Sequence, residues 1–246
     1  MLGRLILAVC ALALFACENS VEFSAKMPAG VEKAEPKTAA VKNPAFLPAH
    51  KLPWEHRVPG KVDSYTDFRA LHPQWYAITE PPTGNFRPMM EWEPMVANII
   101  TYSNYLPADA QVSQTIVDTA VASVEIGEMW VIVEAPGAKA DFENKMKLAG
   151  VTDAVIADRV KYFDIVNDAI WQIDYGPFPL VNEDTQSVAF ADWRYYHPRV
   201  LDDAIPTRLA NILGISTYRS PFDFEGGNFQ ADGEQYCYFG ERTYYY

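Results

Sequence analysis

The chain has 246 residues, a formal net charge of −12 and a pI near 4.7, and 49% of its residues are apolar. This length and composition suffice for one sizeable domain with extensions. The acidic balance argues against a nucleic-acid partner, which requires a basic face, and is compatible with a cationic substrate. Cysteine is sparse (Cys10, Cys17 and Cys237), so we do not expect a disulfide framework.

The first seventeen residues are typical of a bacterial lipoprotein signal peptide. One positive charge, Arg4, precedes an apolar run from Leu5 to Phe15. That run is too short to cross a bilayer, which takes ~20 residues. The sequence "LFAC" at 14–17 resembles the site where processing acylates the cysteine, so Cys17 is the expected lipidation site and the cell envelope the expected location. An ordinary secretory signal or a membrane-anchored helix is the alternative.

Residues 18–87 are predicted to form a tether and a flanking segment. Residues 18 to about 60 are rich in Lys, Pro, Ala and Glu, and their prolines prevent regular helix or strand. The aromatic side chains within 61–87 are suited to docking on a domain. We expect the folded body at 88–246.

Strands and helices alternate through the predicted body, as the changing apolar period indicates. Strands are expected at 95–102, 129–134, 178–182, 187–193, 216–220, 235–240 and 242–246. Helices are expected at 108–124, 138–150 and 201–214, and one or two more strands within 151–164. This order favours an α/β or α+β fold with repeated units. No glycine-rich loop follows the dinucleotide or P-loop pattern.

Local signals predict the ends and inner faces of the helices. Asp109 is expected to cap the first helix, and Gly150 and Gly214 to end the others. The inner faces are expected to consist of Val112, Ile116, Ala120 and Val124 in the first helix and Leu201, Ile205, Leu209 and Ile212 in the third. Asp232-Gly233 between apolar strands predicts a hairpin.

The segment "WQIDYGPFP" (171–179) is the first candidate site. It fits a simple turn, because Gly176 and Pro177 break the chain and Asp174 is able to bond nearby backbone. It also fits a guanidinium site. A flat cation of this kind takes a carboxylate, here Asp174, for its paired N–H donors and a ring face, here Trp171, for stacking.

Two further segments carry candidate residues. In "ADWRYYHPRVLDDAI" (191–205), His197 and Arg199 flank a proline and are suited to binding an anion such as a carboxylate, although a surface loop before a helix explains them too. In "DFEGGNFQADG" (223–233), two glycines permit unusual backbone angles beside Glu225, which is able to face a cleft. A tight turn followed by a hairpin is the plain alternative.

Taken together and in this order, the three segments and "MMEWEPM" (89–95) resemble the agmatine deiminase and bacterial peptidylarginine deiminase family over roughly residues 88–246. The resemblance implies the pentein fold, a five-bladed α/β propeller, present here only as its first blades. It also implies a guanidino substrate (an arginine-bearing peptide or agmatine) and no cofactor. The sequence itself shows no metal-ligand spacing.

The resemblance also implies roles for individual residues. Asp174 corresponds to the catalytic aspartate that binds the guanidinium, and Trp171 lines the pocket. Arg199, with His197, corresponds to a basic pair that holds the terminal carboxylate of a peptide. Where the family commonly has arginine before the aspartate, this chain has Ile173.

The family takes its catalytic histidine and second acid from a downstream "H-x-D" motif and its cysteine from near the end of the domain. This chain has no such motif, and its last histidine is His197. We therefore expect a fragment of a longer reading frame that is inactive by itself. Cys237 lies too early for the nucleophile, and its alternating apolar strand predicts an inert core cysteine.

The resulting hypothesis is hydrolysis of a guanidinium group to a ureido group and ammonia, as from peptidyl-arginine to citrulline. A non-catalytic envelope lipoprotein that binds arginine-bearing peptides is the alternative. A weaker third hypothesis is a carboxylate-based hydrolase that uses Asp174 and Glu225. The amidinotransferases share the pentein fold, so their reaction is a further alternative. The choice among free arginine, agmatine and peptidyl-arginine, and the oligomeric state, stay open at this point.

Overall fold

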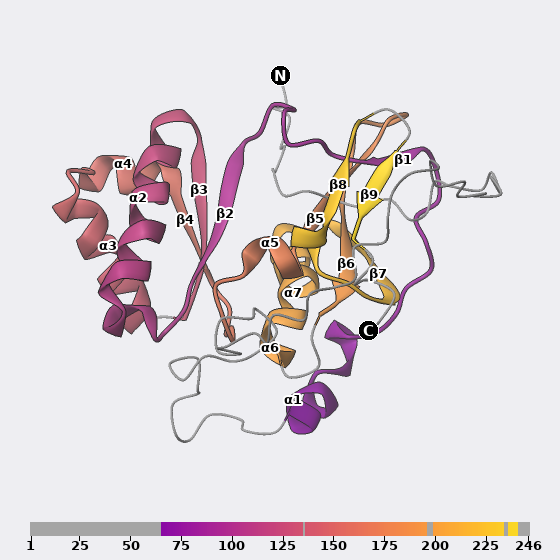
Figure 1. Ribbon diagram of the computed structural model, residues 1–246, viewed down its shortest axis with the longest axis horizontal. Coiled ribbons are helices and arrows are strands. Elements are labelled where there is room, and N and C mark those ends of the chain that lie inside the picture. The colour runs from indigo at the N-terminus through magenta and orange to yellow at the C-terminus, as the bar shows by residue number, and fades with distance from the viewer. Residues whose placement is uncertain (1–64, 135, 196–198, 234–235, 241–246) are drawn as a thin grey trace, which may run out of the picture.

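The computed structural model describes residues 65–134, 136–195, 199–233 and 236–240 (Figure 1). The expectations for Cys17, for the signal and most of the tether, for His197 and for a strand at 242–246 lie outside these residues. Within the described residues, no helix is both long enough and apolar enough to cross a membrane.

One half of the fold is a parallel sheet covered by helices. Its strands are β2 (Ala97–Tyr102), β3 (Glu128–Val133) and β4 (Val160–Asp164), in that order. The connecting helices α2 (Ala110–Ile126), α3 (Gly137–Leu148) and α4 (Asp153–Arg159) lie together on one face of this sheet (Figure 1). The predicted strands at 95–102 and 129–134 and the first two helices are confirmed.

Helix α2 begins as its sequence predicts, because the Asp109 side chain accepts a hydrogen bond from the amide of Val112 at 3.1 Å. One strand, β4, is present within 151–164, where one or two were expected, and α4 occupies most of 151–156. The valines and isoleucine suggested a strand, but the Thr152 side chain caps a helix by accepting from the Val155 amide at 3.3 Å. A cap of this kind outweighs weak β propensity.

The other half is a mixed sheet in the order β1-β5-β6-β7. The strands are β1 (Phe86–Pro88), β5 (Phe178–Asn182), β6 (Val188–Arg194) and β7 (Ser216–Asp223). The β6–β7 pair is parallel and the other pairs are antiparallel. The connection from β6 to β7 carries α6 (Val200–Asp203) and α7 (Ile205–Leu213).

The single helix predicted at 201–214 is therefore broken at Ala204. Pro206 explains the break, because proline has no amide to bond the carbonyl of Asp202 and its ring crowds that carbonyl. Gly214 ends α7 in the left-handed conformation, as predicted. Ile212 is exposed, in contrast to the prediction, and Ala210 is buried instead.

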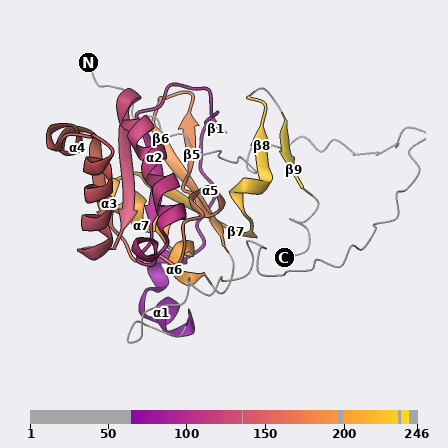
Figure 2. The same cartoon turned by 60° about the vertical axis from the view of Figure 1, so that its left-hand side comes forward.

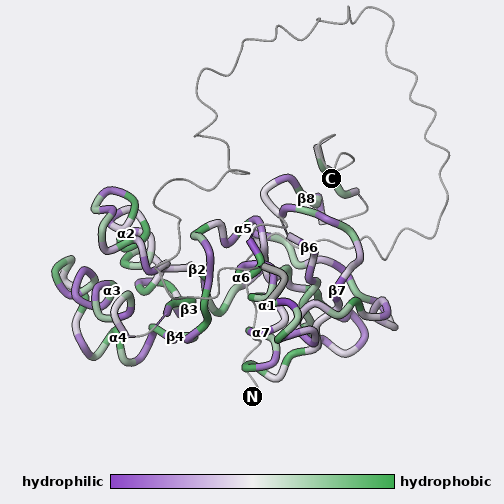
Figure 3. The backbone as a smooth tube through the Cα atoms, turned by 90° about the horizontal axis from the view of Figure 1, so that it is seen from below, coloured by the Kyte–Doolittle hydropathy of each residue, from purple (hydrophilic) through white to green (hydrophobic). Residues whose placement is uncertain are grey.

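A shared apolar layer joins the two halves, which lie side by side in Figure 3. Trp130 and Ile132 from β3 belong to the same buried cluster as Leu209 of α7 and Phe190 of β6. The short helix α5 (Gln172–Tyr175) adds Tyr175 to this layer. The candidate site is thus placed at the junction of the two sheets.

A separate hairpin follows β7. The 3₁₀ helix η5 (Gly226–Asn228) leads into β8 (Phe229–Ala231), which pairs with β9 (Cys237–Phe239). The predicted hairpin at Asp232-Gly233 is confirmed, with a longer loop that Asp232 N closes by donating to Tyr236 O at 3.1 Å. Cys237 is exposed, so the prediction of a core cysteine is wrong. Its strand alternates like a core strand, but β9 is the outer strand of the hairpin, on the far side of β8 from the main body (Figure 2), and its residues are exposed.

The segment before β1 docks on the domain through its aromatic side chains, as expected. It contains α1 (Tyr65–Leu71) and the 3₁₀ helix η3 (Pro73–Trp75), and a further 3₁₀ helix, η4 (Leu106–Ala108), precedes α2. Phe68 packs with Val200 and Ala204. The Tyr76 hydroxyl donates to Val200 O at 2.6 Å.

Candidate guanidinium site

Asp174 lies on α5, a single helical turn held at the end of β2. Thr101, near the end of β2, donates its hydroxyl to Gln172 Oε1 at 2.6 Å and accepts from the Tyr175 hydroxyl at 2.6 Å. The chain then leaves α5 through Gly176 in the positive-φ region (φ 80°). The predicted turn is thus a short helix, fixed on both sides of Asp174.

The two glycines of the "EGG" segment pack directly against this turn. A Cβ atom built on Gly226 would fall well inside 3.0 Å of both the Phe178 ring and the carbonyl oxygen of Ile173. A Cβ on Gly227 would lie 2.5 Å from Asp174 Oδ1, and the Gly227 amide hydrogen-bonds the Asp174 carboxylate. Two motifs about fifty positions apart in the sequence therefore form one site.

The Asp174 carboxylate is 8% exposed, and burial raises its pKa above the ordinary value. Three neighbours act in the opposite direction: the Gly227 amide, the positive charge of Arg199 and the Tyr195 hydroxyl. The site thus holds a carboxylate whose ionised form is only partly compensated by its surroundings.

Arg199 is placed beside this carboxylate and beneath the surface. It precedes α6, is 1% exposed, and its Nη1 atom lies 3.8 Å from Asp202 Oδ2. Burial raises the pKa of Asp202 well above its ordinary value, the charge of Asp168 adds to this, and Arg199 opposes it. The structure thus brings Arg199 to the predicted site, whereas its role toward a peptide carboxylate stays a prediction. His197 lies outside the described residues.

Trp171 and Glu225 flank the same turn. Trp171 immediately precedes α5 and packs, half-buried, against the apolar layer between the sheets. Glu225 immediately precedes η5 and is half-buried. The four candidates within the described residues are therefore carried by two contacting segments, α5 with η5, and by the start of α6. Their roles toward a substrate stay predictions.

The sequence analysis missed the residues that hold these segments in place. Asp202 Oδ1 accepts from the amides of Asp168 (2.7 Å) and Ala169 (3.2 Å), which lead into α5. Asp203 Oδ1 accepts from the Tyr195 amide at 2.7 Å and from Arg219 Nη2 at 2.7 Å. The adjacent acids at a helix start were the only available signal. Among the described residues, no group of three or more His, Cys, Asp or Glu side chains is arranged to hold a metal ion.

Comparisons with known proteins agree with this fold. The chain is 26% identical over 174 residues to a Photobacterium profundum protein named "Putative agmatine deiminase", covering 65% of this chain and 45% of that protein. The solved C. jejuni agmatine deiminase matches with a TM-score of 0.51 at 18% identity, covering 65% of this chain and 47% of the other. A substrate-bound variant of that enzyme gives 0.52 at 17% identity and the same coverage.

These matches define an α/β protein with the fold of the agmatine deiminases, a class that acts on guanidino groups. The family model described as Porphyromonas-type peptidyl-arginine deiminase matches residues 87–245. The chain belongs to this family. It spans less than half the length of the relatives reported above.

Proposed function

We propose that Asp174 binds the guanidinium group of an arginine-bearing peptide or of an agmatine-like substrate. The whole protein then hydrolyses that group to a ureido group and ammonia. Trp171 lines the pocket, and Glu225 contacts the substrate from the other segment. Arg199 and His197 hold the carboxylate of a peptide substrate.

The burial of Asp174 under the Gly226–Gly227 turn carries this proposal. A carboxylate that is removed from water but only partly compensated favours a cation that brings its own hydrogen-bond donors. A guanidinium supplies both the charge and two parallel N–H groups. The C. jejuni agmatine deiminase variant has been solved with substrate bound, which adds support from the fold family.

Catalysis is proposed for the whole protein and binding for this chain. In the resembling enzymes, a cysteine thiolate attacks the guanidinium carbon, a histidine moves the protons, and acids hold the nitrogens. This chain carries the binding acid and matches less than half of its relatives' length. A pentein propeller, to which this chain contributes the first blades, belongs to the same proposal, and the presence of two separate sheets, each with helices in its connections, supports it.

A non-catalytic lipoprotein that binds arginine-bearing peptides is the second candidate. Cys237, the single cysteine among the described residues, lies exposed on β9 and not on the segments that form the site, which favours binding without thiol chemistry in this chain. Both candidates share the proposed lipid anchor at Cys17 and a place in the cell envelope.

Calorimetric titration of the full chain with agmatine and with N-acetyl-arginine amide tests the binding site. Asp174→Asn is expected to weaken binding about 10- to 150-fold, since a hydrogen-bonded charge is lost. Asp158→Asn, a change of the same kind at a mostly exposed acid, serves as the matched control. Equal affinities for wild type and Asp174→Asn would rule out the proposed site.

An ammonia-release assay on the native protein, isolated from the cells that make it, separates the candidates, because catalysis is proposed for the whole protein and binding for this chain. Binding with ammonia release supports deimination, and binding without it supports the lipoprotein that only binds. Release that survives alkylation of the thiols would instead favour the carboxylate-based hydrolase.

A further inference from the structure

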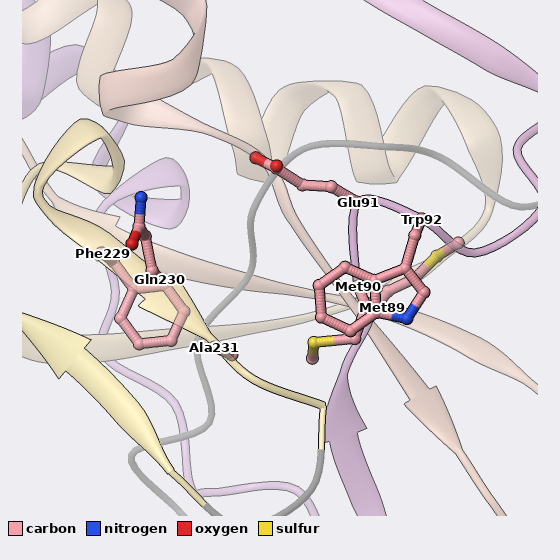
Figure 4. Close-up of a pocket in the computed structure, with 7 residues that line it drawn as sticks. All are labelled: Met89, Met90, Glu91, Trp92, Phe229, Gln230 and Ala231. Atoms are coloured by element: carbon pink, nitrogen blue, oxygen red, sulfur yellow. The ribbon is translucent and has the colours of Figure 1, made fainter.

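A small cavity lies between the segment that follows β1 and strand β8 (Figure 4). Its volume is about 250 Å³. It is lined by Met89, Met90, Glu91, Trp92, Phe229, Gln230 and Ala231. Sites for drug-sized ligands occupy about 300–1,000 Å³, so this cavity is suited to a single side chain.

The cavity has an apolar floor and an aromatic rim. Met89, Met90 and Phe229 are buried, whereas Trp92 is 68% exposed. The β8–β9 turn closes one end, because a Cβ atom on Gly233 would lie 2.8 Å from a Trp92 ring carbon. Methionine side chains adapt their shape to what they contact. An exposed tryptophan over a buried methionine floor therefore fits an incoming apolar group.

The chain connects this cavity directly to Asp174. Phe229 comes two residues after Gly227, whose amide reaches the Asp174 carboxylate. Since a strand rises about 3.3 Å per residue, Phe229 and Ala231 lie no more than about 7 and 13 Å along the chain from Gly227.

A peptide that places its guanidinium at Asp174 spans the same distance. The arginine side chain has five bonds of roughly 1.5 Å from Cα to the guanidinium carbon, which reach about 6 Å, and the next Cα lies about 3.8 Å further on. The side chain of the neighbouring residue thus falls roughly 10–14 Å from the guanidinium, a reach comparable with the distance of up to about 13 Å along the chain from Gly227 to Ala231 at the cavity.

We propose that this cavity binds the apolar side chain of the residue next to arginine in a peptide substrate. The inference rests on the function proposed above and assigns peptidyl-arginine as the substrate class. Agmatine and free arginine have no group that fills the cavity. The exposed Glu91 at the rim and the net charge of −12 favour a cationic peptide over an acidic one.

The test compares acetyl-Leu-Arg with acetyl-Gly-Arg, each with the free terminal carboxylate that Arg199 is proposed to hold, by calorimetry on the full chain. Burial of one leucine side chain predicts about tenfold tighter binding of the leucine peptide. Trp92→Ala and Ala231→Leu, which open and fill the cavity, are each expected to reduce this ratio to about one to three. Ile126→Ala, at an exposed apolar residue on α2, is the matched control and is expected to retain the full ratio.

The outcomes distinguish a failure of the cavity assignment from a failure of the proposed function. Equal affinities for the two peptides, with binding that still depends on Asp174, overturn the assignment of the cavity and leave the guanidinium site intact. A leucine preference that persists in Trp92→Ala and Ala231→Leu also overturns the cavity. Binding of both peptides that is indifferent to Asp174→Asn overturns the function on which the inference rests.

Discussion

Replacement of Gly226 by alanine is expected to destabilise the fold by separating the two segments of the site. The added Cβ atom would fall well inside 3.0 Å of two Phe178 ring atoms and of the Ile173 carbonyl oxygen. Neither the Phe178 ring nor the Ile173 carbonyl is able to move without a large cost in free energy. Phe178 is fully buried with Trp193 and Phe224, and the carbonyl belongs to the backbone of α5. The overlap therefore has to be relieved by moving α5 and η5 apart.

Overpacking of a filled core lowers the free energy of unfolding by about 1–3 kcal/mol. Because the Phe178 ring and the Ile173 carbonyl are both rigidly held, we expect Gly226→Ala to lie at the upper end, near 3 kcal/mol. For a folded part of this size each kcal/mol lowers Tm by about 2–4 °C, so we expect a fall of about 6–12 °C. Thermal unfolding followed by circular dichroism measures it.

Gly137→Ala is the matched control for this experiment. Gly137 begins α3, and a Cβ atom there would meet nothing within 4 Å. Alanine has less freedom than glycine in the unfolded chain, so Tm is expected to stay the same or rise slightly. A Tm of Gly226→Ala within about 2 °C of wild type would refute the contact between the two segments.

Two further predictions concern the site and its support. Gly227→Ala is expected to leave Tm nearly unchanged, because the residue is exposed, but to weaken agmatine binding about tenfold in calorimetry by displacing Asp174 Oδ1 and its charged hydrogen bond. Unaltered affinity would contradict it. Burial raises the pKa of Asp192 from 3.8 to about 6, so the folded state binds its proton more tightly than the unfolded state does. The free energy of unfolding should therefore fall by up to about 3 kcal/mol as the pH rises from 3.8 to about 6. Asp192→Asn should remove this slope in urea unfolding at pH 4 and pH 7, and an unchanged slope would contradict the assignment.

Much of the fold is predictable because its signals are local. The Asp109 cap, the Gly214 end and the Asp232-Gly233 turn each depend on a few neighbouring residues, and all three appear where the sequence indicates them. The differences from a simple pattern arise where local signals compete. At 151–156 the Thr152 cap outweighs a run of β-branched residues, and at Ala204 a proline two positions later divides a helix.

The site was predictable only as separate motifs. No local pattern indicates that Gly227 approaches Asp174, because that contact requires the chain to pass through β5, β6, α7 and β7 first. For the same reason the sequence did not reveal that Arg199 is buried. Cys237 illustrates the opposite limit: an alternating strand predicts a buried face only if another layer covers it, and in the described residues β9 is exposed.

The acidic pair Asp202 and Asp203 at α6 explains how the segments of the site are held in position. Asp202 accepts hydrogen bonds from the amides at the entry to α5, and Asp203 accepts one from the amide of Tyr195 at the end of β6. Asp203 also pairs with Arg219 at 2.7 Å and, through its other oxygen, with Arg69 of α1 at 2.7 Å. Buried ion pairs of this kind add little net stability, since desolvation offsets their attraction.

Their contribution is orientation, because three of the four carboxylate oxygens accept from a defined donor, and the fourth, Asp202 Oδ2, lies 3.8 Å from Arg199 Nη1. Through Arg69, the α1 segment, which precedes the family-matched region 87–245, joins the same set of contacts. We infer that the position of Asp174 depends on α1 as well as on the two motifs that surround it. A chain that begins at residue 87 lacks α1 and would therefore be a poor substitute for the full chain in the binding experiments above.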